Sequence, residues 1–164
     1  MQIRPASPAD VEQVLPMVAA ICSMHAGLDP ARYAMLPDVV ERYRRWLPQR
    51  AQDPRSVFLV AEDSGTLAGF LVATIEPNIP IYQLGEFGFI HDLWVQPAHR
   101  GAGVARALVL AAADRFREVG ARQIRLETAA ANEPARRLFE ACGFRVATID
   151  MLRELSGSAD APND

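Results

Sequence analysis

A glycine-bearing turn between an extended run and a helical run constrains the fold most. Residues 87–95 are rich in aromatic and β-branched side chains, which predicts a strand, and residues 104–119 repeat apolar residues at helical spacing. The turn between them, residues 96–103, is Gln-Pro-Ala-His-Arg-Gly-Ala-Gly. Glycines let a ligand approach the backbone closely, and the free amides and dipole of a helix N-terminus stabilise phosphate oxygens. The turn therefore predicts a phosphate site to which Arg100 adds charge, although a plain tight turn has the same pattern.

Two common phosphate motifs do not fit this turn. A dinucleotide fingerprint needs a third glycine where this chain has Arg106, and the next predicted strand does not complete the required βαβ unit. A P-loop needs Gly-Lys-Ser/Thr, which is absent from the sequence. The phosphate ligand is therefore expected to be of another kind.

The remaining pattern predicts an α/β sandwich rather than a doubly wound fold. Residues 3–5, 57–61, 67–75 and 124–128 read as strands, with turn residues Asp-Ser-Gly making a hairpin of the second and third. A helix is expected after Ser7, with Pro16 kinking or breaking it, and a second helix near residues 37–47 is expected to end at Pro48. Residues 132–142 predict a short helix stopped by Gly143, and residues 144–155 predict a last strand. The order is β, α, α, β, β, β, α, β, α, β.

Composition bounds the class of protein. The 164 residues, half of them apolar, suit one domain, which we place at residues 1–155, with a disordered tail at residues 156–164 rich in Ser, Gly, Asp and Pro. The net charge of -3 gives no support to nucleic-acid binding, and the apolar runs are shorter than a membrane span. Two isolated cysteines, Cys22 and Cys142, predict neither a disulfide framework nor a metal site. We therefore expect a soluble cytoplasmic protein without metal.

Three segments together resemble one family. Residues 100–105, Arg-Gly-Ala-Gly-Val-Ala, are similar position by position to the acyl-CoA motif Arg/Gln-x-x-Gly-x-Gly/Ala of the GNAT superfamily of N-acetyltransferases. Upstream, residues 91–97 resemble the family's fourth strand, and downstream residues 132–144 resemble its Asn-x-x-Ala-x-x-Leu-Tyr...Gly-Phe signature. The resemblance implies a mixed, mostly antiparallel sheet whose central strands splay apart, with helices on both faces.

The resemblance also implies how acetyl-CoA is held. The pantetheine arm is expected in the gap beside the fourth strand, and the pyrophosphate on the glycine turn, with Asn132 near the pantetheine or capping the following helix. A backbone N–H near Leu93 is expected to polarise the thioester carbonyl. The cofactor-binding residues implied are Leu93, Trp94, Val95, Arg100, Gly101, Ala102, Gly103, Val104, Ala105, Asn132 and Phe139.

The attacking amine must lose a proton, so a base is expected in the site. His91 is the first candidate, since imidazole titrates near ~6.5 and strand alternation places it on the same face as Leu93 and Val95. A core histidine without a chemical role is the alternative. Glu86 is the second candidate base, and a solvated edge residue is its alternative, while alternation directs Asp92 to the opposite face unless a bulge intervenes.

Two departures from the family pattern bear on function. Phe139 occupies the position of the tyrosine that protonates the leaving thiolate in many members of the family. Either Tyr82, Tyr33 or water serves instead, or the thiolate leaves unassisted, which a thiol pKa of roughly 8.5 makes tolerable. The short stretch of residues 144–155 leaves little room for a final hairpin, and pairing with a second subunit would make a homodimer. The apolar residues Ile79, Ile81, Tyr82, Phe87 and Phe89 suggest an acceptor with a hydrophobic part, unless they are core.

The sequence thus predicts an acetyl-CoA-dependent N-acetyltransferase that acylates a small-molecule or peptide primary amine by direct attack in a ternary complex. The alternative is an acyl-CoA-binding regulatory module without turnover, which the phenylalanine at position 139 motivates. A structural domain whose glycine turn binds nothing is the third hypothesis.

Overall fold

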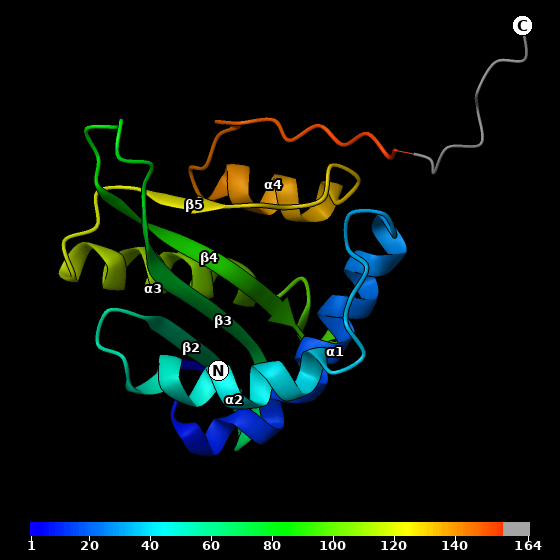
Figure 1. The fold of residues 1–164 in the computed structure, drawn as a ribbon. Helices are drawn as coiled ribbons and strands as arrows, with labels where there is room; N and C mark the ends of the chain where they lie inside the picture. Colours follow the sequence, from blue (N-terminus) through cyan, green and yellow to red (C-terminus); the bar gives the residue numbers. More distant parts are fainter. Residues whose placement is uncertain (156–164) are drawn as a thin grey trace, which may run out of the picture.

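Five strands form a single mixed sheet in the computed structural model, which describes residues 1–155 (Figure 1). The predicted tail of residues 156–164 lies outside the described part of the chain. Neighbouring strands follow chain order, and all pairs are antiparallel except the last, which is parallel. The strands are β1 (Gln2–Pro5), β2 (Val57–Asp63), β3 (Thr66–Pro77), β4 (Glu86–Val95) and β5 (Ile124–Leu126).

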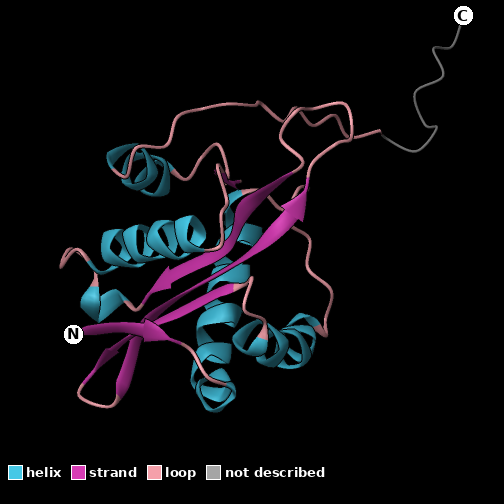
Figure 2. Cartoon of the chain, turned by 90° about the vertical axis from the view of Figure 1, so that its left-hand side faces the viewer, coloured by secondary structure: helices cyan, strands magenta, loops and turns pink. Residues whose placement is uncertain are grey.

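Helices cover both faces of this sheet (Figure 2). Two of them, α1 (Val11–Leu28) and α2 (Val39–Gln52), form one core with the face of β2 and β3 that carries Phe58, Val60, Phe70 and Val72. The other face carries α3 (Val104–Glu118), and Phe139 of α4 (Glu133–Ala141) belongs to the same second core. Short 3-10 turns, Pro8–Asp10 and Pro97–His99, precede α1 and the glycine turn. The predicted mixed α/β architecture is confirmed.

Both prolines that were expected to interrupt helices lie inside them. Pro16 lies in the second turn of α1, which runs without a break, and Pro48 lies within α2, which continues four residues further. Packing explains the second case, because Leu47 is fully buried and Ala51 packs against the same core. A helix that ended at residue 47 would withdraw Ala51 from that contact. Burial therefore outweighs the hydrogen bond that Pro48 cannot donate.

The predicted last strand is wrong. After α4 ends, residues 144–155 follow an irregular path past α4 and β5 towards the link between α1 and α2 (Figure 1). No described strand pairs with them, although β5 has a free edge. The segment meets the link between α1 and α2 through an exposed ion pair, Arg32 Nε to Asp150 Oδ2 at 3.3 Å. Its apolar side chains, such as Ile149 and Met151, remain exposed.

The expectation that the apolar runs are shorter than a membrane span does not hold for helix α1 and the turn before it. Residues Pro8–Leu28 are long and apolar enough to cross a membrane by length and composition alone. In the fold, one side of this helix is buried in the core through Val11, Val14, Leu15, Met17, Val18, Ile21 and Cys22. A core helix accounts for that composition, and the cytoplasmic location stays a prediction.

Close packing of α3 on the sheet depends on Gly88 of β4. A Cβ at this position would lie 2.9 Å from three ring carbons of Phe116, which is fully buried, so the ring or the backbone would have to shift. We expect Gly88→Ala to lower the free energy of unfolding by about 1–3 kcal/mol. Chemical denaturation measures this loss. The matched control is Gly85→Ala, where a Cβ meets nothing within 4 Å; an equal loss in both variants would contradict the packing explanation.

Candidate active site

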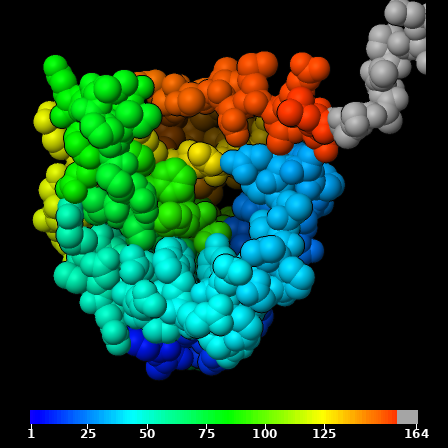
Figure 3. Space-filling view, in the orientation of Figure 1, coloured from blue at the N-terminus to red at the C-terminus, as the bar shows by residue number. Residues whose placement is uncertain are grey.

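Strands β4 and β5 separate after a short paired stretch and leave a cleft beside the open edge of β4. Strand β5 pairs with β4 only from Gly88 to Ile90, so residues 91–95 of β4 have no neighbouring strand on that side among residues 1–155. A cleft of about 500 Å³ extends along this open edge from α1 to the glycine turn and α4. Figure 3 shows the hollow in this face, bordered by the green, yellow and blue parts of the chain. The predicted splay of the central strands is present.

The open edge of β4 presents backbone groups to the cleft. Gln96 N–H donates to Ala68 O at 2.8 Å, which marks that pair as hydrogen-bonded. In an antiparallel ladder such pairs alternate with pairs whose N–H and C=O groups point away from the partner strand. Leu93 lies opposite Leu71, three positions along the register, so its backbone groups point away from β3 and towards the cleft. The same holds for Val95.

The glycine turn places a helix N-terminus at one end of the cleft. Gly101 and Gly103 have φ of +78° and +79°, a left-handed conformation that other residues adopt only with strain. Gly103 directly precedes α3, and in the described part of the chain no backbone carbonyl accepts from the amides of residues 104–106. Gly101, Gly103, Val104 and Ala105 line the cleft, whereas Ala102 is not among the lining residues. The free amides suit a bound anion.

Arg100 is folded back against the end of β4. Its Nε donates to Val95 O at 3.0 Å, and its guanidinium carbon lies 4.7 Å from the centre of the Trp94 ring. Both Arg100 and Trp94 line the cleft. The cation is therefore positioned by a stacked ring and a carbonyl beside the glycine turn, where it adds positive potential to the free amides.

A bulge in β4 overturns the alternation predicted around His91. Val72 pairs with Asp92 and Ala73 with Ile90, so His91 has no partner on β3. The rings of His91 and Trp46 of α2 meet edge to face at 5.3 Å, and Asp92 accepts a hydrogen bond from Tyr43 of the same helix. The two side chains thus share one face, because the extra residue breaks the two-residue period.

Leu93 and Val95 point the other way from His91. Their side chains belong to the core beneath α3. The prediction that His91 shares their face is therefore wrong, and the bulge that was allowed for at Asp92 is present, so Asp92 lies on the face of His91. His91 still lines the cleft, since the cleft follows the edge of the strand rather than one face.

His91 contacts two residues that the sequence analysis missed. Its Nε2 lies 2.6 Å from Thr74 Oγ1 and 3.6 Å from Glu76 Oε1, both on β3. Burial lowers the pKa of His91 from its ordinary value, against the opposing effect of the Glu76 charge. Strand alternation places Thr74 and Glu76 on the same face of a strand. Their position next to His91 depends on the pairing of β3 with β4, which could not be read from the sequence.

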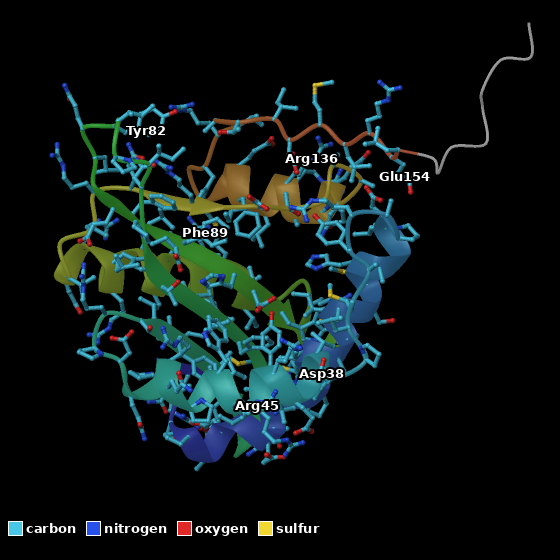
Figure 4. The ribbon with its side chains drawn as sticks, viewed as in Figure 1. Asp38, Arg45, Tyr82, Phe89, Arg136 and Glu154 are labelled. Atoms are coloured by element: carbon cyan, nitrogen blue, oxygen red, sulfur yellow. The ribbon has the colours of Figure 1, made fainter. Side chains whose placement is uncertain are left out.

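The other base candidate lies outside the cleft. Glu86 is exposed at the start of β4, pairs with Arg55 at 2.5 Å and is not among the lining residues. Tyr82 lies in the β3–β4 loop with 56% of its surface exposed, and Ile81 beside it is 81% exposed (Figure 4). Phe89, by contrast, is half-buried and its ring lies 5.1 Å from that of His91.

The two predicted residues near α4 both reach the cleft. Asn132 caps α4, with its Oδ1 accepting from Ala135 N–H at 3.3 Å, and it also lines the cleft. Phe139 is buried and packs edge to face on Phe144 at 5.6 Å. A capping asparagine and a packed phenylalanine thus form the side of the cleft opposite β4.

Asp92 is a buried carboxyl behind the cleft. Burial raises its pKa to about 6, and the Tyr43 hydroxyl, at 2.8 Å from Oδ2, works in the opposite direction. Because the folded pKa exceeds the ordinary 3.8, the folded state binds the proton more tightly than the unfolded state. The stability that this group contributes is complete below about pH 4 and is lost as the pH rises to about 6.

We expect Asp92→Asn to remove that pH dependence, because an amide oxygen still accepts from Tyr43 without carrying charge. The free energy of unfolding of the variant relative to the parent should rise by roughly 3 kcal/mol between pH 4 and pH 7. Urea unfolding at both pH values measures the difference. A difference independent of pH would contradict the shifted carboxyl.

Comparison with known proteins agrees with this geometry. The model of the Acetyltransferase (GNAT) family matches residues 23–144. A mycothiol acetyltransferase of Thermobispora bispora is 35% identical over 65% of this chain, although the match covers only 37% of that longer protein. An uncharacterised N-acetyltransferase of Archaeoglobus fulgidus is 30% identical over 97% of this chain and 98% of its own length.

Solved structures share the fold. A mutant of a Bacillus halodurans protein superposes with a TM-score of 0.81 at 22% identity, covering 94% of this chain and 99% of that one. A predicted acetyltransferase from Clostridium acetobutylicum, solved with acetyl-CoA, gives a TM-score of 0.72 at 18% identity, covering 94% and 95%. Together with the cleft and the glycine turn, the family match shows that the chain belongs to the GNAT acetyltransferase family.

Proposed function

We propose that this chain transfers an acetyl group from acetyl-CoA to a primary amine by direct attack within a ternary complex. The observation that carries the proposal is one cleft of about 500 Å³ that joins a free helix N-terminus, an unpaired strand edge and a half-buried histidine. These are an anion site, a row of fixed backbone donors and a base, in that order along β4. The name of the Thermobispora relative supports a small-molecule acceptor.

The residues present fit a coenzyme A thioester. The amides of Gly103, Val104 and Ala105 would hold the pyrophosphate, and the backbone of residues 93–95 would hold the pantetheine arm as an added strand does. The Leu93 N–H would donate to the thioester oxygen, on which negative charge develops during attack. Such a donor is fixed beforehand by the β3–β4 ladder, so it costs no reorganisation.

His91 would take the proton that the amine gives up. The nitrogen bonds to the acetyl carbon, the carbon–sulfur bond breaks, and the thiolate leaves. Phe139 has no proton to donate, and neither Tyr33 nor Tyr82 lines the cleft, so water would supply the proton to the thiolate. A thiol pKa of roughly 8.5 makes departure as thiolate tolerable.

Two measurements test this proposal separately. Calorimetric titration with acetyl-CoA tests the cofactor site, and the absence of binding at millimolar ligand would reject it. Detection of released thiol over a panel of small amines and peptides tests turnover. Binding of acetyl-CoA without thiol release from any amine would instead favour the regulatory module.

A further inference from the structure

Thr74 is a buried hydroxyl between a carboxylate and the proposed base. It is 5% exposed, and its Oγ1 donates to Glu76 Oε1 at 2.5 Å while lying 2.6 Å from His91 Nε2. Both distances are short enough for strong hydrogen bonds. The three side chains therefore form a continuous chain from the exposed rim of β3 to the cleft.

The available protons determine which atom donates in each of these two hydrogen bonds. A threonine hydroxyl has one proton, and the Glu76 carboxylate only accepts, so that proton lies between Oγ1 and Glu76. The contact between Oγ1 and Nε2 then needs a proton on the nitrogen. A neutral His91 arranged in this way holds its proton on Nε2 and its lone pair on Nδ1.

The other ring nitrogen, Nδ1, has no hydrogen-bond partner in the described part of the chain. Within residues 1–155 no group bonds to His91 Nδ1, and this atom is absent from the buried polar atoms that lack a partner, so it keeps contact with solvent. The ring is held between Trp46 at 5.3 Å and Phe89 at 5.1 Å, both edge to face. These neighbours oppose the flip that would exchange the two nitrogens.

We propose that Thr74 and Glu76 are positioning residues that fix His91 as the Nε2–H tautomer and so make Nδ1 the atom that accepts the proton of the acceptor amine. Only the role of Nδ1 as acceptor of the amine proton rests on the proposed function; the assignment of the tautomer does not. In the imidazolium, Nε2–H keeps its bond to Thr74, and the negative charge of Glu76 stabilises the new positive charge. No proton leaves the Thr74 hydroxyl during the reaction.

Charged groups other than Glu76 also lie near His91. Arg50 of α2 lowers the pKa of His91, opposite to Glu76 on β3. Asp92, next along β4, has its buried carboxyl bonded to Tyr43. Because these groups remain in place, a change at Glu76 isolates its own contribution.

The first test needs no turnover. Nitrogen-15 NMR of the histidine rings in the unmodified chain, at a pH where His91 is neutral, distinguishes the two tautomers by their two-bond couplings. His91→Ala identifies the relevant signals by removing them. We expect the Nε2–H form, and a ring protonated on Nδ1 would overturn the proposal. A failure of the proposed function would leave this result unchanged.

The second test is kinetic and compares variants with the parent chain. Each is assayed with acetyl-CoA and the amine that the parent chain acetylates with the highest kcat/KM. Thr74→Val, which keeps the shape but removes the hydroxyl, should lower kcat/KM about tenfold or more while KM for acetyl-CoA changes less than about twofold. Thr74→Ser should restore most of the activity. The matched control is Thr66→Val on the same strand, distant from His91 and exposed. Equal losses in the serine and valine variants, or in the control, would overturn the proposal.

Glu76→Gln provides the pH readout. Loss of its charge removes the stabilisation of the imidazolium, so the acidic limb of the kcat/KM profile should move to lower pH. A merely structural role for Glu76 would reduce the amount of folded protein without moving the limb. An unmoved limb, or one moved to higher pH, would therefore contradict the positioning role.

Discussion

Gly103→Val is expected to weaken acetyl-CoA binding about a hundredfold or more. Gly103 has a φ of +79°, and a β-branched residue there costs about 1–2 kcal/mol in strain, which the turn would relieve by changing its backbone conformation. The amides that begin α3 would then point away from the pyrophosphate. Each charge-assisted hydrogen bond is worth about 1.5–3 kcal/mol, and about 1.4 kcal/mol corresponds to a tenfold change in affinity. Calorimetric titration measures the loss.

A matched control separates binding from stability. Gly65, in the turn between β2 and β3, has a φ of +83°, and a Cβ there meets nothing within 4 Å, as at Gly103. Gly65→Val should therefore lose a similar amount of unfolding free energy while keeping its affinity for acetyl-CoA. If both variants lost affinity equally, the glycine turn would not be the phosphate site.

His91→Ala is expected to lower kcat/KM by about a hundredfold to ten-thousandfold, the usual contribution of a general base. Burial lowers the pKa of His91 from the ordinary 6.5, so the ring is neutral and able to accept a proton at pH 7. Activity of the parent chain should fall as the pH drops through that pKa, and this acidic limb should disappear in the variant. Affinity for acetyl-CoA, measured by titration, should change little.

A second histidine provides the comparison. His25 at the end of α1 also lines the cleft, and burial lowers its pKa as well. Its ring is stacked on Tyr33 at 5.0 Å and has no carboxylate partner among the bonds in residues 1–155. His25→Ala should keep the acidic limb. If the limb vanished with His25 and persisted without His91, the base would be His25.

The parts of the fold and site that depend on nearby residues could be predicted from the sequence. The glycine turn, the helix after it and the Asn132 cap each follow from residues within a few positions of one another, and all three are present. The order of strands and helices up to α4 followed from hydrophobic periodicity in the same way. The splayed strands came from the family resemblance.

The wrong predictions concern features that depend on contacts between residues far apart in the sequence. Nothing near Pro48 reveals that Ala51 packs on the core, and only the pairing of β3 with β4 shows that His91 is the extra residue of a bulge. The same pairing brings Thr74 to His91. Residues 144–155 have the apolar composition of a strand but no described strand beside them. Register and neighbours, which depend on the whole sheet, could not be read from the segment alone.

The two tryptophans of the chain both lie beside the proposed chemistry. Trp94 carries the Arg100 guanidinium on its ring at the cleft, and Trp46 meets the His91 ring at its edge. The ultraviolet emission of this protein therefore originates at the two ends of its site. Ligand arriving at the glycine turn should change the Trp94 signal, and a protonated imidazole should quench Trp46, so occupancy and protonation could be followed optically without any added dye.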